Sequence, residues 1–313
     1  MRLPWRPIAV LALTAVVAGP LAACGDTASP AVADGGKLAV VATTTQVADF
    51  ARNIGGDHVV VTQILKPNID PHDYEPTPAD ITAIGAAKVV LKSGVGLEKW
   101  LDETIASAGF KGATVDTSTG VQVRQGNGEQ EEAAGDPHIW HDPRNAKIMA
   151  QNIAKAFAAA DPAAAATYEQ NRAGYSAKLD RLDADIQAKI DKLPAGNRQL
   201  VTNHDAFGYY IERYHLQFVG SIIPSFDTSA ELSAQDIDDI VAKIRQTGTK
   251  AVFSESSLPP KTAEAIAKQA GVKVVAGEDA LYGDTLGPEG SAGDTYLKME
   301  QHNTDVIVQA LGG

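Results

Sequence analysis

From Lys37 onward the chain alternates between short apolar runs and longer stretches in which apolar residues recur every three or four positions. Short continuous apolar runs bounded by polar turns are typical of strands buried on both faces of a parallel sheet. Apolar residues at helical spacing indicate amphipathic helices between those strands. In the first half, strands are predicted at Leu38–Thr44, Val59–Ile64, Lys88–Leu91 and Ala113–Asp116, and helices at Gln46–Ile54, Ala79–Ala87, Leu97–Ala108 and Arg144–Phe157.

The second half of the chain repeats this order of elements without a recognisable sequence repeat. Strands are predicted at Gln199–Thr202, Gln217–Ile222, Ala251–Ser254 and Val272–Val275, and helices at Ala206–Tyr214, Ala234–Gln246, Thr262–Ala270 and Ala292–Leu311. Alternating strands and helices in both halves predict an α/β fold with two lobes, each a mainly parallel β-sheet flanked by helices.

A long helical stretch separates the two halves. Asp161 is expected to cap it with Pro162 at the first helical position, and Pro194 marks its end. A helix of about 30 residues would measure about 45 Å at 1.5 Å per residue, which suits one long rigid helix joining two lobes. The predicted organisation is therefore an N-terminal lobe at 37–160, a linking helix at 161–193 and a C-terminal lobe at 194–313.

The N-terminus has the pattern of an export signal. Arg2 and Arg6 precede an apolar run too short to span a bilayer securely, and small residues lead to Cys24, the only cysteine of the chain. This pattern resembles the lipobox of bacterial lipoproteins, in which the cysteine is lipidated, although an ordinary secretory signal with a chance cysteine is the alternative. We expect a signal peptide at 1–24, a flexible tether at 25–36 and an extracytoplasmic protein anchored to the membrane through Cys24.

Composition narrows the classes of function. Apolar residues make up 44% of the chain, which is enough for a substantial core, and the net charge of −12 argues against nucleic acid as a partner. The sequence has no H-E-x-x-H, no P-loop, no nucleophile elbow and no G-x-G-x-x-G after a strand. We therefore expect a binding protein and not an enzyme.

Four residues stand out as candidate metal ligands because of where they lie along the chain. His72 and His138 lie in proline-bounded loops, His204 lies where a predicted strand gives way to a helix, and Asp284 lies in a Gly/Pro loop before the last helix. Loops at strand ends are where ligands bind in open α/β sheets. Three imidazoles and one carboxylate would make a closed four-ligand set for Zn²⁺ or Mn²⁺, with no open position for catalysis.

The surrounding motifs carry a resemblance over about Lys37 to Leu311. The stretches PHDYEPTPAD, DPHIWHDPRNA, VTNHDAFGYY and LYGDTLGPEGSAGDTY are similar to those of the cluster A-I (cluster 9) solute-binding lipoproteins of ABC importers, the ZnuA/TroA/PsaA type. The resemblance implies metal ligands His72 and His138 from the N-terminal lobe, and His204 and Asp284 from the C-terminal lobe. It also implies delivery of the metal to an ABC permease by a protein that we expect to be a monomer.

The choice of metal stays open at this point. A third histidine at position 204 favours zinc over manganese. Against zinc, the stretch Gln122–Gly135 lacks the histidines that many zinc-binding members of the family carry there. This stretch is predicted to be an exposed mobile loop. Manganese is the alternative ion, and a periplasmic metallochaperone or an adhesin is the alternative role. A zinc hydrolase would need an open coordination position, which four protein ligands do not leave.

The remaining polar candidates have weaker positions. His141 is expected at an edge, facing solvent or capping a helix, although it could be an alternative ligand because it is near His138. Glu255 and Asp205 are candidates for hydrogen bonding to a ligand imidazole. The remaining histidines are expected to be surface residues: His58, His215 and His302.

Overall fold

The first half of the chain forms a four-stranded parallel sheet. The computed structural model describes residues 1, 36–126 and 133–312. The strands are β1 (Leu38–Ala42), β2 (Val59–Gln63), β3 (Val89–Lys92) and β4 (Ala113–Asp116), in the order β2-β1-β3-β4. Val40 of β1 lies opposite Val61 on one side and Val89 on the other. The β-branched side chains that predicted the two central strands, β1 and β3, are buried in this register.

Four helices accompany this sheet, and their starts follow local chemistry. They are α1 (Thr45–Gly55), α2 (Pro78–Ala86), α3 (Leu101–Ser107) and α4 (Pro143–Ala160). The Thr44 side chain caps α1, Thr77 and Asp80 form a capping box at α2, and Asp142 caps α4. The helix predicted at Leu97–Ala108 begins later, at Leu101, and residues 97–100 form turns that follow a segment of positive φ angles at Gly94, Val95 and Gly96.

The second half is also built from parallel strands, but they form two pairs. Strands β5 (Gln199–His204) and β6 (Gln217–Ile223) make one pair, and β7 (Ala251–Phe253) and β8 (Lys273–Val275) make the other, with β7 packed beside β5. The helices are α6 (Gly208–Tyr214), α7 (Ala234–Thr247), α8 (Lys261–Ala270) and α9 (Tyr296–Gly312). The predicted α/β fold is confirmed, and the single C-terminal sheet is replaced by these two pairs.

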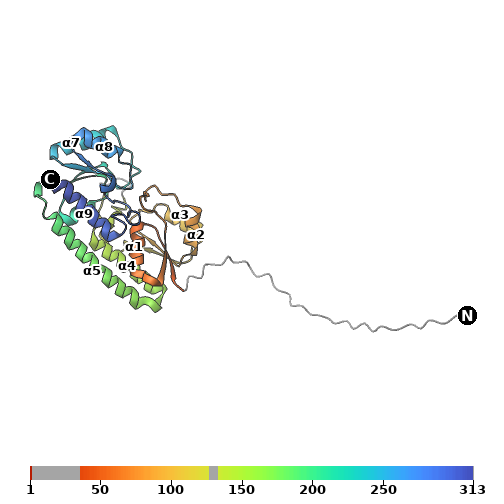
Figure 1. Cartoon of the computed structure of the whole chain (residues 1–313). Helices are drawn as coiled ribbons and strands as arrows, with labels where there is room; N and C mark the ends of the chain where they lie inside the picture. Colours follow the sequence, from red (N-terminus) through yellow and green to blue (C-terminus); the bar gives the residue numbers. More distant parts are fainter. Residues whose placement is uncertain (2–35, 127–132, 313) are drawn as a thin grey trace. The chain divides into compact units, whose positions relative to one another are not determined.

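The long helix α5 (Ala165–Ile190) has 26 residues and measures about 39 Å. A 3-10 turn, Pro162–Ala164, precedes it, so the prediction that Asp161 caps this helix is wrong: the N-cap is Ala164, and the Asp161 carboxylate accepts a hydrogen bond from the Tyr168 hydroxyl. Figure 1 shows α5 beside α4, and α5 also packs against α1 and α9. Its apolar residues, among them Leu179 and Ile186, are buried in that packing.

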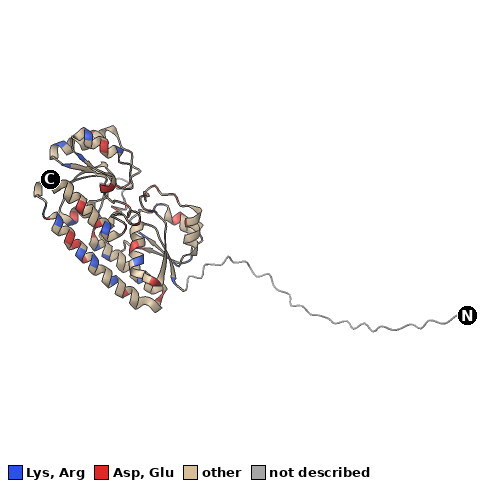
Figure 2. Ribbon diagram, in the orientation of Figure 1, with Lys and Arg blue, Asp and Glu red and all other residues tan. Residues whose placement is uncertain are grey.

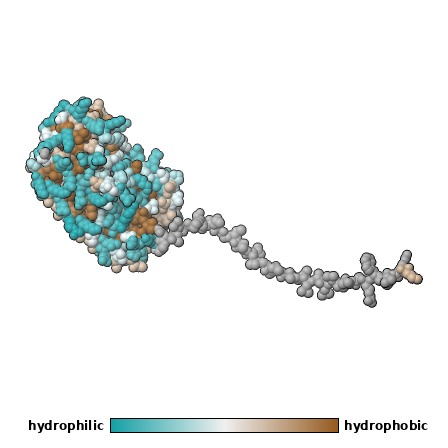
Figure 3. Space-filling view, in the orientation of Figure 1, coloured by the Kyte–Doolittle hydropathy of each residue, from teal (hydrophilic) through white to brown (hydrophobic). Residues whose placement is uncertain are grey.

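The surface of residues 36–312 is mixed in charge. Figure 2 shows Lys and Arg alternating with Asp and Glu along α5, and Figure 3 shows a mainly hydrophilic face with scattered apolar patches. Among the described residues, no helix combines the length and apolar character that a membrane crossing requires. The predicted leader, Cys24 and nearly all of the predicted tether lie outside the described residues.

Candidate metal centre

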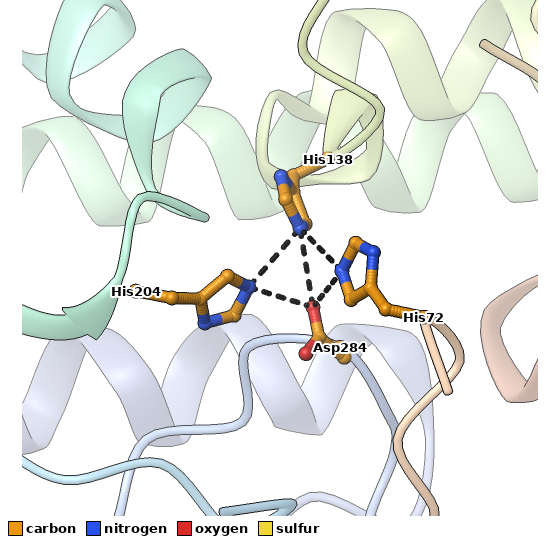
Figure 4. A group of neighbouring side chains, drawn as sticks. All are labelled: His72, His138, His204 and Asp284. Carbon is orange, nitrogen blue, oxygen red and sulfur yellow. Dashed lines mark hydrogen bonds and ion pairs between the residues drawn. The ribbon is translucent and has the colours of Figure 1, made fainter. Parts of the chain in front are cut away.

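Four side chains from distant parts of the chain meet at one point. His72 lies in the loop between β2 and α2, His138 precedes the 3-10 turn Ile139–His141, His204 ends β5, and Asp284 lies between β8 and α9. Figure 4 shows the three imidazole rings and the carboxylate facing a common centre. The His72 side chain is 3% exposed and the other three are fully buried.

The distances between the facing atoms are close to the edges of a small tetrahedron, with His72 slightly outside it. His138 Nε2 lies 3.3 Å from His72 Nε2 and 3.2 Å from His204 Nε2. Asp284 Oδ1 lies 3.3 Å from His138 Nε2, 3.3 Å from His204 Nε2 and 3.9 Å from His72 Nε2. A tetrahedral ion with bonds of about 2.0 Å would hold its ligand atoms about 3.3 Å apart, which is the spacing of the His138, His204 and Asp284 atoms. His72 lies 3.9 Å from Asp284, and all four ligand atoms lie within 4.8 Å of one another, so a small movement of His72 completes the set.

Two of the imidazoles are oriented from behind by carboxylates. Asp136 Oδ1 lies 2.8 Å from His138 Nδ1, and Glu255 Oε2 lies 2.7 Å from His204 Nδ1. Glu255 Oε1 also accepts the backbone N–H of His204 at 3.0 Å. A proton on His138 Nδ1, donated to Asp136, leaves Nε2 as the atom that can bind a metal at the centre. Glu255 lies at ion-pair distance from His204 Nδ1 without hydrogen-bond geometry, and its hydrogen bond is with the His204 backbone.

Asp136 is itself held in place by Arg124. The Arg124 guanidinium donates to Asp136 Oδ2 and also to Glu212 Oε1 at 2.9 Å, while Tyr209 donates to the backbone carbonyl of Asp136 at 2.9 Å. Arg124 lies in the stretch predicted to be an exposed mobile loop, of which residues 127–132 are outside the described part. The beginning of that stretch is therefore fixed by polar contacts behind His138.

The electrostatics of the centre favour a cation. Burial lowers the pKa of His72 to about 3, so its imidazole is neutral and able to bind a metal. Burial alone would raise the pKa of Asp284, but His204 and the other imidazoles hold it well below the usual range. Burial would lower the pKa of His138, but its contacts with Asp136 and Asp284 raise it to about 9, so a metal ion must displace a proton from this imidazole at neutral pH. Neither carboxylate oxygen of Asp284 has a hydrogen-bond partner among the described residues.

A small cavity of about 40 Å³ lies outside His72. Its lining includes Lys99 from the first half of the chain and Phe226 and Asp227 from the second half. Lys99 forms an ion pair with Asp227 there. Close by, the Thr228 hydroxyl donates to Asp70 Oδ2 at 2.6 Å. The mouth of the centre is thus closed by polar contacts between the two halves.

The structure corrects two of the sequence predictions. His141 does not face solvent and does not cap α4: it is fully buried, with Nε2 2.9 Å from the Gly283 carbonyl and Nδ1 2.8 Å from Glu300 Oε1. His302 is not a simple surface residue, because its half-buried ring packs on Tyr282 and its Nε2 lies 3.0 Å from the Ala280 carbonyl.

The other polar residues considered as partners of the ligands differ in whether they contact the metal centre. Glu255 contacts His204 as described, whereas Asp205 is largely buried in a separate hollow beside Phe218. His58 and His215 are exposed, as predicted. The sequence reasoning gave no role to Asp136, although its place two residues before His138 across a proline was the available signal.

Comparisons with known proteins agree with this architecture. Residues 40–310 match the family model described as ZnuA, zinc-uptake complex component A periplasmic. The chain is 33% identical to the manganese ABC transporter substrate-binding lipoprotein PsaA of Streptococcus mitis, covering 96% of this chain and 97% of that protein. It is 33% identical to the iron-binding protein YfeA of Yersinia pestis, covering 88% and 87%.

A solved structure gives the same result for the fold. The periplasmic zinc-binding protein TroA of Treponema pallidum superposes with a TM-score of 0.81 at 31% identity, covering 89% of this chain and all of that chain. The two α/β lobes joined by a long helix are thus a known architecture. The chain belongs to the ZnuA family, the metal-binding, solute-binding proteins of ABC transporters.

Proposed function

We propose that this protein binds Zn²⁺ outside the cytoplasm through His72, His138, His204 and Asp284 and delivers it to the permease of an ABC importer. The observation that carries the proposal is the convergence of these side chains, whose ligand atoms all lie within 4.8 Å of one another. The buried Asp284 carboxylate requires positive charge beside it, which imidazole protons supply in the metal-free protein and a bound metal ion would supply in their place.

The donor set supports zinc as the cargo. Three imidazoles and one carboxylate suit a borderline ion that accepts tetrahedral coordination, and Zn²⁺ has no geometric preference of its own that opposes this arrangement. The relatives named above are described with manganese, iron or zinc, so the ion is a matter for direct measurement. Manganese is the second candidate, because the same four groups are also hard enough to hold it.

The closed ligand set supports transport over catalysis. A catalytic zinc ion keeps a coordination position for water, whereas His72, His138, His204 and Asp284 together complete a tetrahedron. Binding by both halves of the chain suits a carrier that closes around its cargo, with the Lys99 and Asp227 pair at the mouth. A metallochaperone would use the same centre, and dependence of metal uptake on a permease separates that role from import.

The N-terminal pattern supports attachment to the outer side of the membrane through Cys24. The relative from Streptococcus mitis is named a lipoprotein, and the motif Leu21-Ala22-Ala23-Cys24 matches the expected cleavage site. Expression of the full chain with radiolabelled palmitate should label the protein and place it in the membrane fraction. The variant Cys24→Ser should lose the label, and persistent labelling of that variant would refute the anchor.

Metal binding is tested on the soluble chain from Lys37 onward, stripped with a chelator. Competitive titration should show tight binding of one Zn²⁺ per chain, with Mn²⁺ bound more weakly. His204→Ala should weaken zinc binding by orders of magnitude because it removes one of four ligands. His215→Asn is the matched control, since it changes an exposed histidine at a positive φ angle that asparagine tolerates.

Two results would count against the proposal in different ways. Retention of Mn²⁺ in the presence of Zn²⁺ would replace zinc by manganese and leave the site intact. Unchanged zinc affinity in His204→Ala would refute the site itself.

A further inference from the structure

His141 occupies a position between the metal centre and the last helix. Its ring stacks on Phe207 with centroids 4.5 Å apart and an interplanar angle of 26°. One nitrogen faces Glu300 of α9 and the other faces the carbonyl of Gly283, the residue before Asp284. All of these groups are buried, so the hydrogen bonds are shielded from competing water.

The protonation pattern fixes the direction of the contact with Gly283. Because a carbonyl oxygen can only accept, Nε2 of His141 must carry a proton and donate it. The Nδ1 atom and Glu300 Oε1 then share one further proton, either as an imidazolium with a carboxylate or as a neutral imidazole with a carboxylic acid. In both cases His141 donates to Gly283, and Glu300 holds the ring in that orientation.

The chain changes its hydrogen-bonding partners at Gly283. The two residues before it are bound to the C-terminal half, because Leu281 N–H donates to Ser254 and Tyr282 N–H donates to Asn303. Gly283 instead accepts from Trp140 Nε1 at 3.0 Å as well as from His141.

The residues after Gly283 are bound to the N-terminal half. Gln46 Nε2 donates to the Asp284 carbonyl at 2.8 Å, and Leu286 N–H donates to Thr45 Oγ1 at 2.8 Å. Asp284 therefore belongs to the C-terminal half by sequence and is held by the N-terminal half through its backbone.

Apart from the three imidazoles that it faces, the side chain of Asp284 has no such support of its own. Its two oxygens have no hydrogen-bond partner in the described part of the chain, although the residue is buried. The direction in which the carboxylate points is therefore set by the backbone on either side of it. A shift of the Gly283 carbonyl would rotate the peptide that carries Asp284 and move Oδ1 away from the three imidazoles.

We propose that His141 is a positioning residue for Asp284: by donating to the Gly283 carbonyl it fixes the backbone that aims the carboxylate at the metal. The inference rests on the proposed metal centre and adds a residue outside its ligand set. It also assigns a role to Glu300, which holds the His141 ring from the opposite side. The contact also couples the positions of His138 and Asp284, because His138 immediately precedes the short turn that carries His141.

The test separates positioning from general stability. The double variant His141→Phe/Glu300→Leu keeps an aromatic ring on Phe207, removes both hydrogen bonds and leaves no unpaired carboxylate behind. The variant Glu300→Gln keeps a side chain able to hydrogen-bond Nδ1. His302→Phe is the matched control, because His302 also lies on α9 and contacts a carbonyl, that of Ala280, but within the described part of the chain makes no hydrogen bond to Gly283 or Asp284.

Each chain is stripped of metal and loaded with Co²⁺, whose visible absorption reports tetrahedral coordination, and its zinc affinity and metal-free melting temperature are measured. We expect the double variant to lose intensity in the cobalt bands and to bind zinc about 10- to 100-fold more weakly, as for other partners that orient metal ligands. Glu300→Gln should stay close to the wild-type protein. His302→Phe should change only the melting temperature.

The outcomes are distinguishable. A double variant that melts at a lower temperature but keeps the wild-type cobalt spectrum and zinc affinity would overturn the positioning role. A wild-type chain without a tetrahedral cobalt spectrum would refute the proposed metal centre, and the positioning role with it.

Discussion

Asp49 is a buried carboxyl whose charge opposes folding at neutral pH. It lies on α1 at 7% exposure, and its Oδ2 accepts from the Tyr296 N–H at 3.2 Å and from the Tyr175 hydroxyl at 3.4 Å. It thus joins α1, α5 and the start of α9. Burial raises its pKa from 3.8 to about 6, against the lowering effects of these hydrogen bonds and of Arg52.

The sign of the pH effect follows from the raised pKa. Below pH 3.8 both folded and unfolded chains hold the proton, and Asp49 does not affect the free energy of unfolding. Between 3.8 and about 6 the unfolded chain loses its proton first, so stability falls as pH rises. A difference of about two pKa units corresponds to about 3 kcal/mol, and this penalty is fully present at pH 7.

Asp49→Asn removes the charge and keeps an oxygen that can accept both hydrogen bonds. We expect the variant to be more stable than the wild type by less than about 1 kcal/mol at pH 4, by about 2 kcal/mol at pH 5 and by about 3 kcal/mol at pH 7. Urea denaturation of metal-free protein at each pH measures this difference. Asp57→Asn, at an exposed position next to α1, is the control.

The pH profile decides the outcome. A gain in stability that is the same at pH 4 and pH 7 would show that the amide improves packing and that the charge is not the cause. A loss of stability at pH 7 would show that the ionised carboxylate strengthens its hydrogen bonds by more than burial costs.

Three further predictions concern the metal centre. Glu255→Gln should weaken zinc binding about 10- to 100-fold, because it removes the negative charge 2.7 Å from His204 Nδ1. Titration against a chelator measures the affinity, and an unchanged affinity would contradict this prediction. Gly283→Ala should also weaken binding, since an added Cβ would lie 2.4 Å from Glu255 Oε2, and full affinity would show that this carboxylate moves freely. Lys99→Met should increase the rate of zinc release, measured by stopped-flow chelation, because it removes the ion pair with Asp227. An unchanged rate would show that this ion pair does not limit release.

Local patterns predicted most of the fold because local physics determines it. The run Ala113–Asp116 is a strand with the predicted bounds, and the residues of Ala234–Gln246 form a helix that extends by one residue to Thr247. The failures occurred where a competing local interaction is stronger. Asp161 was predicted to cap α5, but its carboxylate instead accepts a hydrogen bond from the nearby Tyr168 hydroxyl.

The candidate site was only partly predictable. His72, His138, His204 and Asp284 could be singled out because each lies in a turn-rich loop at the end of an element. His141 was misplaced because its partner Glu300 is 159 residues away, and no local pattern reveals that contact. The same holds for the two pairs of C-terminal strands, since the separation of β5–β6 from β7–β8 depends on long-range packing.

The centre combines rigid support with an unsatisfied charge. Carboxylates hold His138 and His204 from behind, and backbone contacts hold Asp284, yet the Asp284 oxygens lack partners of their own. A buried carboxylate in this state costs free energy that positive charge at the common point recovers. Because the ligand atoms of His138, His204 and Asp284 already lie at the edge lengths of a coordination tetrahedron, binding needs little rearrangement beyond a small movement of His72. On the proposed function, this preorganisation would let the centre compete for a scarce ion, and the Lys99→Met variant tests whether release depends on the Lys99 and Asp227 pair.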